Sequence, residues 1–141
     1  MPAAERFLLD TSAILALTDQ EEGFDKVEEL LDRAVAEEIE VVICAVSPME
    51  LYYITLQEEG EDQASRLVAL VKSWPVRWIY PDETTLLLAG RLKAFHRLSF
   101  ADAVIAGVAM FHRAALVHKD PEFEALAQEI SLFSLPYKSP K

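Results

Sequence analysis

The sequence predicts an α/β protein in which a parallel sheet is covered by helices on both faces. Several short apolar runs occur, and the clearest, at residues 40–46, is nearly unbroken and rich in β-branched residues, as expected of a strand buried on both sides. Between them, apolar residues recur at helical spacing with acidic residues in the intervening positions, as at 24–35. Because single helices or helix pairs alternate with the apolar runs, we expect parallel strands in a three-layer α/β/α arrangement.

The expected elements are short and follow one another closely. Strands are expected at 6–9, 40–46, 75–80, 115–117 and, at an edge of the sheet, 130–133. Helices are expected at 11–17, 24–35, 47–58, 61–71, 82–95 and 99–113, with another short helix after Asp120. Two helices begin with a capping pattern, in which Ser precedes an acidic residue by three positions, at Ser47–Glu50 and Ser99–Asp102. Pro48 also suits the first position of its helix.

The length of 141 residues and the hydrophobic fraction of 52% suit one domain with a substantial core. We expect this domain to cover residues 1–134 and the segment 135–141 to form a loose tail. The longest apolar run, at 103–111, falls well short of the roughly 20 residues of a membrane span, and the N-terminus lacks a secretion signal. We therefore expect a cytoplasmic protein. Cys44, the single cysteine, is interpreted as a buried hydrophobic residue.

The charge of the chain is unevenly distributed. The formal net charge of −11 by itself disfavours a polyanionic partner. Residues 1–83, however, contain 19 acidic and 6 basic residues, whereas residues 84–119 contain 5 basic residues and one acidic residue. The basic segment is consistent with an ordinary solvated helix surface, and equally with a local positive surface that binds a polyanion.

Four acidic residues stand where a predicted strand ends or a predicted helix begins: Asp10, Glu50, Asp102 and Asp120. Each is also explained as a helix cap, which contributes roughly 0.5–2 kcal/mol. In a doubly wound parallel sheet, however, the carboxyl ends of the strands share one edge, and sites form where the strand order reverses. Because Asp10 and Asp120 follow strands that can be neighbours at that point, the four carboxylates are predicted to converge.

Converging carboxylates require a cation. Two carboxylates about 4 Å apart repel each other by roughly 4 kcal/mol at an effective dielectric constant near 20, which exceeds what one cap returns. A cluster of oxygen ligands suits Mg²⁺ or Mn²⁺, whereas a single cysteine disfavours a zinc site. The sequence therefore predicts a Mg²⁺ or Mn²⁺ site, and such ions commonly serve phosphoryl chemistry.

Four motifs occur in the order Phe7–Ile14, Val46–Leu51, Leu98–Ala103 and Leu116–Phe123. In order and spacing they resemble those of PIN-domain ribonucleases, and of the VapC-type toxins of toxin–antitoxin pairs in particular. The resemblance implies that Asp10, Glu50, Asp102 and Asp120 are the catalytic, metal-binding acids, supported by the hydroxyl of Ser12 or Thr11. It also implies a five-stranded parallel sheet, a homodimer and a small antitoxin protein as partner.

One position departs from the family pattern. The residue two positions before the fourth acid is often Thr or Ser in the family, but here it is His118. His118 is interpreted either as part of the strand end or as a contact for substrate phosphate. Glu122 is interpreted as a solvated helix residue, or as one that acts through a water molecule. The other candidates for RNA contact are basic residues of the positive segment: Arg91, Lys93, Arg97 and Lys119.

Three functions are compatible with these features. The leading hypothesis is a Mg²⁺- or Mn²⁺-dependent endoribonuclease that hydrolyses RNA phosphodiester bonds and acts as the toxin of a toxin–antitoxin pair. The alternative is a catalytically weak PIN-like module that acts through protein contacts, for which the apolar helix segment 51–56 provides a surface unless it fills the core. An aspartyl phosphotransfer domain ranks last, because it leaves Glu50 and Asp102 without a role.

Overall fold

The computed structural model describes residues 5–138 and contains a five-stranded sheet in the order β3–β2–β1–β4–β5. All neighbouring strands run parallel. The chain therefore adds strands to one side of β1 first and to its other side afterwards. The strands are β1 (Arg6–Leu9), β2 (Glu40–Cys44), β3 (Arg77–Ile79), β4 (Ala115–His118) and β5 (Leu132–Ser134). The predicted α/β class with a five-stranded parallel sheet is confirmed.

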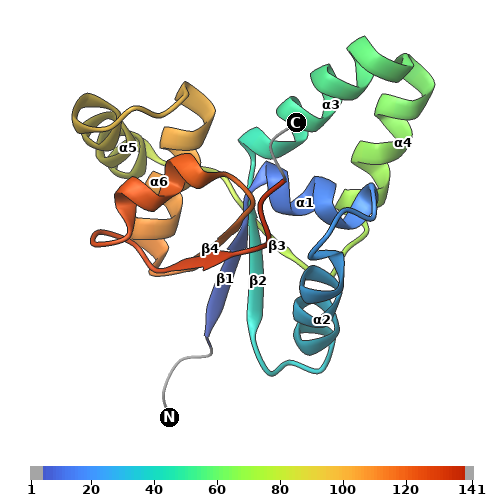
Figure 1. Ribbon diagram of the computed structural model, residues 1–141, viewed down its shortest axis with the longest axis horizontal. Helices are drawn as coiled ribbons and strands as arrows, with labels where there is room; N and C mark the ends of the chain where they lie inside the picture. Colours follow the sequence, from blue (N-terminus) through green and yellow to red (C-terminus); the bar gives the residue numbers. More distant parts are fainter. Residues whose placement is uncertain (1–4, 139–141) are drawn as a thin grey trace.

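Helices cover both faces of this sheet (Figure 1). The helices α1 and α2 pack on one face, and α5 and α6 pack on the other. The helices α3 and α4 pack against each other and extend above the sheet in Figure 1. Their bounds are α1 (Thr11–Thr18), α2 (Phe24–Val35), α3 (Val46–Glu59), α4 (Glu61–Lys72), α5 (Glu83–Phe95) and α6 (Phe100–His112), and a 3₁₀ helix, η1, covers Pro121–Leu126.

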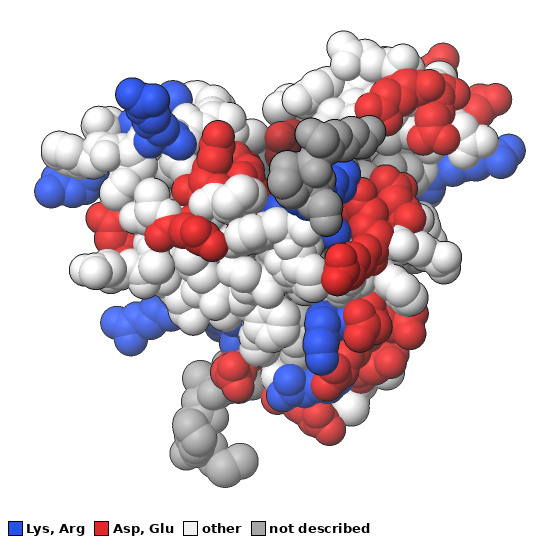
Figure 2. Space-filling view, in the orientation of Figure 1, with Lys and Arg blue, Asp and Glu red and all other residues white. Residues whose placement is uncertain are grey.

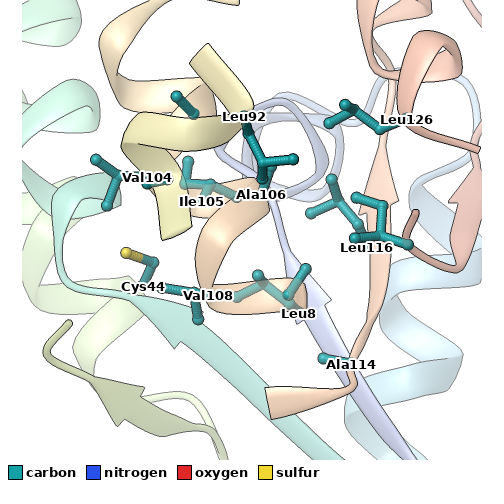
Figure 3. Close-up of a cluster of buried hydrophobic side chains, with 14 of the residues drawn as sticks. Leu8, Cys44, Leu92, Val104, Ile105, Ala106, Val108, Ala114, Leu116 and Leu126 are labelled. Atoms are coloured by element: carbon teal, nitrogen blue, oxygen red, sulfur yellow. The ribbon is translucent and has the colours of Figure 1, made fainter. Parts of the chain in front are cut away.

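The strands are almost wholly apolar because alternate side chains enter two separate cores. Leu8 and Leu116 face the core under α5 and α6, where they meet Ile105 (Figure 3). Complete burial of each such side chain stabilises the fold by roughly 1.5–3 kcal/mol. Cys44 lies in the same core, and burial raises the pKa of its thiol. The interpretation of Cys44 as a buried hydrophobic residue is therefore confirmed.

A close helix crossing brings α5 against α6. A Cβ atom placed on Gly107 of α6 would lie 2.9 Å from the Cβ of Ala89 on α5, closer than real Cβ contacts allow. Gly107 therefore sets the separation of the two helices. This separation matters for function because α6 carries Asp102 in its first turn.

The start of α3 differs from the predicted capping box. The helix begins at Val46, its N-cap is Ala45, and no side chain caps it. Ser47 is completely buried, and its Oγ lies 3.0 Å from Thr11 Oγ1. The predicted N-cap serine was wrong because this tertiary hydrogen bond occupies its hydroxyl. At α6 the prediction holds, since the Ser99 hydroxyl accepts a hydrogen bond of 3.1 Å from the Asp102 amide.

The segment after β5 was expected to be loose. Leu135 is buried, its amide donates to the His118 carbonyl at 2.8 Å, and Lys138 forms an ion pair of 2.8 Å with Glu21. Residues 135–138 therefore pack against the domain, and residues 139–141 lie outside the described part of the chain. Within residues 5–138, no helix has the length and hydropathy needed to cross a membrane.

Candidate metal-binding site

The four predicted acids lie at the carboxyl edge of the sheet, around the point where the strand order reverses. Asp10 directly follows β1, and Asp120 lies two residues beyond its neighbour β4. Glu50 lies early in α3, which follows β2, and Asp102 lies in the first turn of α6. Parallel α/β proteins form ligand sites at this reversal, because the two connections leave a crevice there.

Asp10 is the most buried of these acids, with an exposed fraction of 3%. Its Oδ2 accepts hydrogen bonds from the Ser12 amide at 3.1 Å and the Ser12 hydroxyl at 2.5 Å. Its Oδ1 is buried and has no hydrogen-bond partner among residues 5–138. Burial is the main cause that raises the pKa of Asp10 to about 7; the charges of Asp102 and Glu50 also raise it, and the Ser12 hydrogen bonds oppose the increase. A cation bound at Oδ1 would provide the partner that this buried oxygen lacks among the described residues.

A second part of the site is formed by Asp102, Asp120 and Glu122. Each offers a carboxylate oxygen, and these three atoms lie within 4.8 Å of one another. Burial raises the pKa of Asp102 to about 6, and the charges of Asp120, Glu50 and Glu122 raise it as well. Carboxylates this close repel one another, so a divalent ion between them would be stabilising.

Glu122 was not among the predicted metal-binding acids. The 3₁₀ turn of η1 brings it beside Asp120, whose Oδ1 accepts a hydrogen bond of 2.9 Å from the Glu122 amide. Its spacing of two residues from Asp120 was the available signal. Sequence reasoning placed Glu122 on the solvent face of a helix, and it is indeed exposed while still reaching the cluster.

Two hydroxyl groups organise different acids. Thr11 Oγ1 lies 2.6 Å from Glu50 Oε1, and because a carboxylate only accepts, Thr11 donates this hydrogen bond. Ser12 donates to Asp10, and its Oγ accepts a hydrogen bond of 2.9 Å from the Lys119 amide. Both residues predicted to support the site thus contact it, Ser12 at the first acid and Thr11 at the second.

The available donor atoms fit Mg²⁺ or Mn²⁺. The acids offer carboxylate oxygens, and hard cations prefer such ligands. His118, which lies beside Asp120, has both ring nitrogens in hydrogen bonds within the protein: Nδ1 with the Asp120 amide and Nε2 with Ser134. Burial lowers the pKa of His118. Neither nitrogen is therefore directed to a metal.

The basic residues predicted to contact RNA divide into two groups. Arg91 and Arg97 are exposed on and just after α5, and Lys93 is exposed there with its Nζ donating to the Leu98 carbonyl at 2.8 Å. His118 is completely buried, and the Lys119 ammonium is buried against the Glu22 carbonyl at 2.8 Å. The structure therefore leaves only the first group at a surface.

A groove of about 620 Å³ adjoins the acids on the side of α3 and α4. Apolar, acidic and basic side chains line it together: Leu15, Ile54, Leu67 and Leu70, then Asp19, Glu21, Glu58, Glu59 and Asp120, and finally Arg66, Lys119 and Lys138. Acidic residues gather over α2 and the α3–α4 pair, whereas basic residues lie over α5 (Figure 2). The two sides of the acidic site thus differ in charge.

The fold and the site together define a class of protein: parallel α/β domains with a carboxylate cluster, of a kind that can hold a divalent ion, at the strand-order reversal. The chain belongs to the PIN domain family, whose model matches residues 7–129. No curated protein sequence matches it.

Several solved structures share its fold. The structure of VapBC2 from Rickettsia felis bound to a promoter DNA fragment is similar with a TM-score of 0.75 and 18% identity, over 93% of this chain and 99% of that chain. DNA-bound VapBC from Salmonella typhimurium gives 0.74 and 20%, over 92% and 98%. VapC20 from Mycobacterium tuberculosis, a toxin described as cleaving the sarcin–ricin loop, gives 0.65 and 19%, over 84% and 93%.

Proposed function

We propose that the protein is a Mg²⁺- or Mn²⁺-dependent endoribonuclease and the toxin of a toxin–antitoxin pair. The observation that carries this proposal is the buried Oδ1 of Asp10, which has no hydrogen-bond partner within residues 5–138, at the sheet edge that also holds Asp102 and Asp120. Membership of a family whose members are generally nucleases supports it.

Different side chains would contribute to the metal site in different ways. Asp10, Glu50, Asp102 and Asp120 are the proposed ligands, with Glu122 beside them; Glu50 is close enough to raise the pKa values of Asp10 and Asp102. Ser12 occupies one oxygen of Asp10, so the other remains for the ion. A bound divalent ion would polarise the scissile phosphate and supply a hydroxide near neutral pH.

RNA is the proposed substrate. Arg97 lies in the loop before α6, five positions from Asp102, and Arg91 lies on the exposed surface of α5. This basic side would attract the phosphate backbone despite the negative net charge, because local potential governs such contacts. A solved structure of the same fold, VapC20, is described as a toxin that cleaves the sarcin–ricin loop.

The proposed partners are an antitoxin and a second copy of the chain, in the cytoplasm. Two of the similar structures are VapBC complexes. The groove beside the acids is lined by apolar side chains, five acidic residues and three basic residues, and this excess of acidic residues suits an amphipathic antitoxin segment that carries basic residues. A homodimer is supported by exposed apolar side chains on one face of α3, namely Met49, Tyr53 and Leu56.

The test is RNA cleavage by the purified protein. Structured RNAs would be incubated with Mg²⁺, with Mn²⁺ and with EDTA, alongside the variants Asp10→Asn and Asp62→Asn, the latter removing an exposed carboxylate on α4. We expect metal-dependent cleavage by the wild type and by Asp62→Asn. Asp10→Asn should lose roughly 100-fold or more, because even residues outside the ligand shell cost 10–100-fold when mutated. Cleavage that persists in EDTA or in Asp10→Asn would contradict the proposal.

The alternative, a catalytically weak interaction module, is favoured by the exposed face of α3. Leu51 of the predicted apolar segment is completely buried, whereas Tyr53 and Leu56 are exposed, so part of the segment fills the core and part forms a surface. The same assay separates the two functions if thermal unfolding is followed with Mn²⁺. Stabilisation by Mn²⁺ without cleavage of any RNA would favour the interaction module, since binding to the native state stabilises it.

A further inference from the structure

The end of β4 is held by a buried histidine. His118 is the last residue of β4 and is completely buried, with its ring packed edge-on to Phe123 at 5.2 Å between centroids. Its Nδ1 lies 3.2 Å from the Asp120 amide nitrogen, and its Nε2 lies 3.1 Å from Ser134 Oγ on β5. The ring of His118 therefore connects β5, a strand at the edge of the sheet, to Asp120, the fourth of the predicted acids.

The hydrogen-bond directions follow from the donor chemistry. A backbone amide only donates, so Nδ1 must be unprotonated to accept from Asp120. In the neutral ring, the hydrogen then lies on Nε2, which donates to the Ser134 hydroxyl. The two ring nitrogens thus have different partners: Nδ1 accepts from the Asp120 amide, and Nε2 donates to Ser134 on β5.

The Asp120 amide lies beyond the last ladder bond of β4. The Leu135 amide donates to the His118 carbonyl, and the Lys119 amide donates to Ser12 Oγ, after which the chain turns into η1. At that turn the Nδ1 of His118 takes the place of a strand acceptor for the Asp120 amide. A buried or half-buried amide without an acceptor is costly, so this contact selects the conformation in which Asp120 meets Asp102 and Glu122.

We propose that His118 is a positioning residue that fixes the backbone of Asp120, and through it the direction of the Asp120 carboxylate toward the acidic cluster. This proposal deepens the metal site of the proposed function and rests on it. The proposal also explains how a histidine fits at this position. Because the ring has two nitrogens, one side chain forms hydrogen bonds with both Asp120 and Ser134 of β5.

Two variants with amide side chains test the roles of the two ring nitrogens separately. In His118→Asn, the side-chain oxygen is attached to Cγ as Nδ1 is, so it can accept from the Asp120 amide while the contact to Ser134 is lost. In His118→Gln, the longer side chain reaches toward Ser134 while the acceptor for Asp120 is lost. Ser134→Ala, the control, removes the partner of Nε2, together with a long hydrogen bond of 3.5 Å from the Tyr137 hydroxyl, and leaves Nδ1 unchanged.

The first measurement is the affinity of the metal-free protein for Mn²⁺, by calorimetry. We expect His118→Asn and Ser134→Ala to stay within about threefold of the wild type, and His118→Gln to bind roughly tenfold or more weakly, as is typical when support of a metal ligand is removed. The second measurement is hydrogen exchange of the Asp120 amide by NMR. This amide should be protected in the wild type and in His118→Asn, and should exchange faster in His118→Gln.

The outcomes also distinguish this proposal from the metal site itself. Equal Mn²⁺ affinity and equal Asp120 protection in His118→Asn and His118→Gln would overturn the positioning role. If the wild type bound no Mn²⁺, the metal site would fail, whereas the exchange of the Asp120 amide would still decide whether His118 fixes that residue.

Discussion

The carboxylate of Asp10 combines deep burial with an oxygen that has no hydrogen-bond partner among the described residues. Without a cation, burial makes the charged form unfavourable, and the pKa of Asp10 rises from 3.8 to about 7. A raised pKa in the folded state means that the native protein holds a proton which the unfolded chain has released. Protonation of Asp10 at low pH therefore stabilises the metal-free protein. This contribution is lost as the pH rises from about 4 to 7.

This linkage predicts the pH dependence of stability in the metal-free protein. Between pH 5 and pH 7, the ionisation of Asp10 should lower the free energy of unfolding by about 2 kcal/mol. Urea unfolding in EDTA at the two pH values would measure this change. Asp10→Asn, which cannot ionise, should show a decrease smaller by about that amount; an identical decrease in both proteins would contradict the raised pKa.

At the level of elements, the crossing of α5 and α6 decides where one of the acids lies. Asp102 is in the first turn of α6, its amide is capped by Ser99, and the Gly107 contact with Ala89 follows about a turn and a half later. A side chain at Gly107 would force the helices apart. The position of α6, and with it that of Asp102, thus depends on the absence of a Cβ atom at one residue.

Two glycine substitutions test this dependence. Gly107→Ala should lower the free energy of unfolding by about 1–3 kcal/mol, because its Cβ would lie 2.9 Å from that of Ala89. Gly90→Ala in α5 is the control, since nothing lies within 4 Å of its Cβ position. It should leave stability unchanged or raise it by up to about 1 kcal/mol through helix propensity. Chemical denaturation of both variants measures the difference, and similar values would show that the helices are not held this closely.

At the scale of the whole molecule, charge divides the surface around the acidic edge. Basic side chains stand out over α5, whereas acidic side chains outnumber basic ones over α2 and the α3–α4 pair (Figure 2). The groove beside the acids is lined by five acidic residues and three basic residues. An RNA backbone would therefore approach from the α5 side, and a basic protein segment would suit the groove.

This asymmetry predicts which arginines matter for RNA. In an Asp10→Asn background that prevents cleavage, the double substitution of Arg91 and Arg97 by Ala should weaken RNA binding about tenfold or more. The slope of log affinity against log salt should also fall by about 1.4, as for two lost contacts to single-stranded phosphates. The matched control replaces Lys26 and Arg33 of α2, on the acidic side. Fluorescence anisotropy across a salt series measures both; equal losses would contradict the assignment.

Much of the fold could be predicted because its signals are local. The apolar runs at β1 and β2, the helical spacing in α2 and the Ser99 cap of α6 each lie within a few neighbouring residues. The start of α3 could not be predicted in the same way, since Ser47 satisfies its hydroxyl with Thr11, 36 residues earlier in the chain. The packing of residues 135–138 likewise depends on contacts with distant residues such as Glu21.

The sequence by itself determined the class of fold, the order of its elements and the four acids at the ends of strands or starts of helices, because periodicity and capping are properties of adjacent residues. Only the tertiary structure decided which oxygens share one space. It added Glu122 to the cluster, buried Oδ1 of Asp10 where the described part of the chain offers it no hydrogen-bond partner, and turned His118 and Lys119 inward. These features arise where strands far apart in the chain meet, and burial there is set by the packing of the whole molecule.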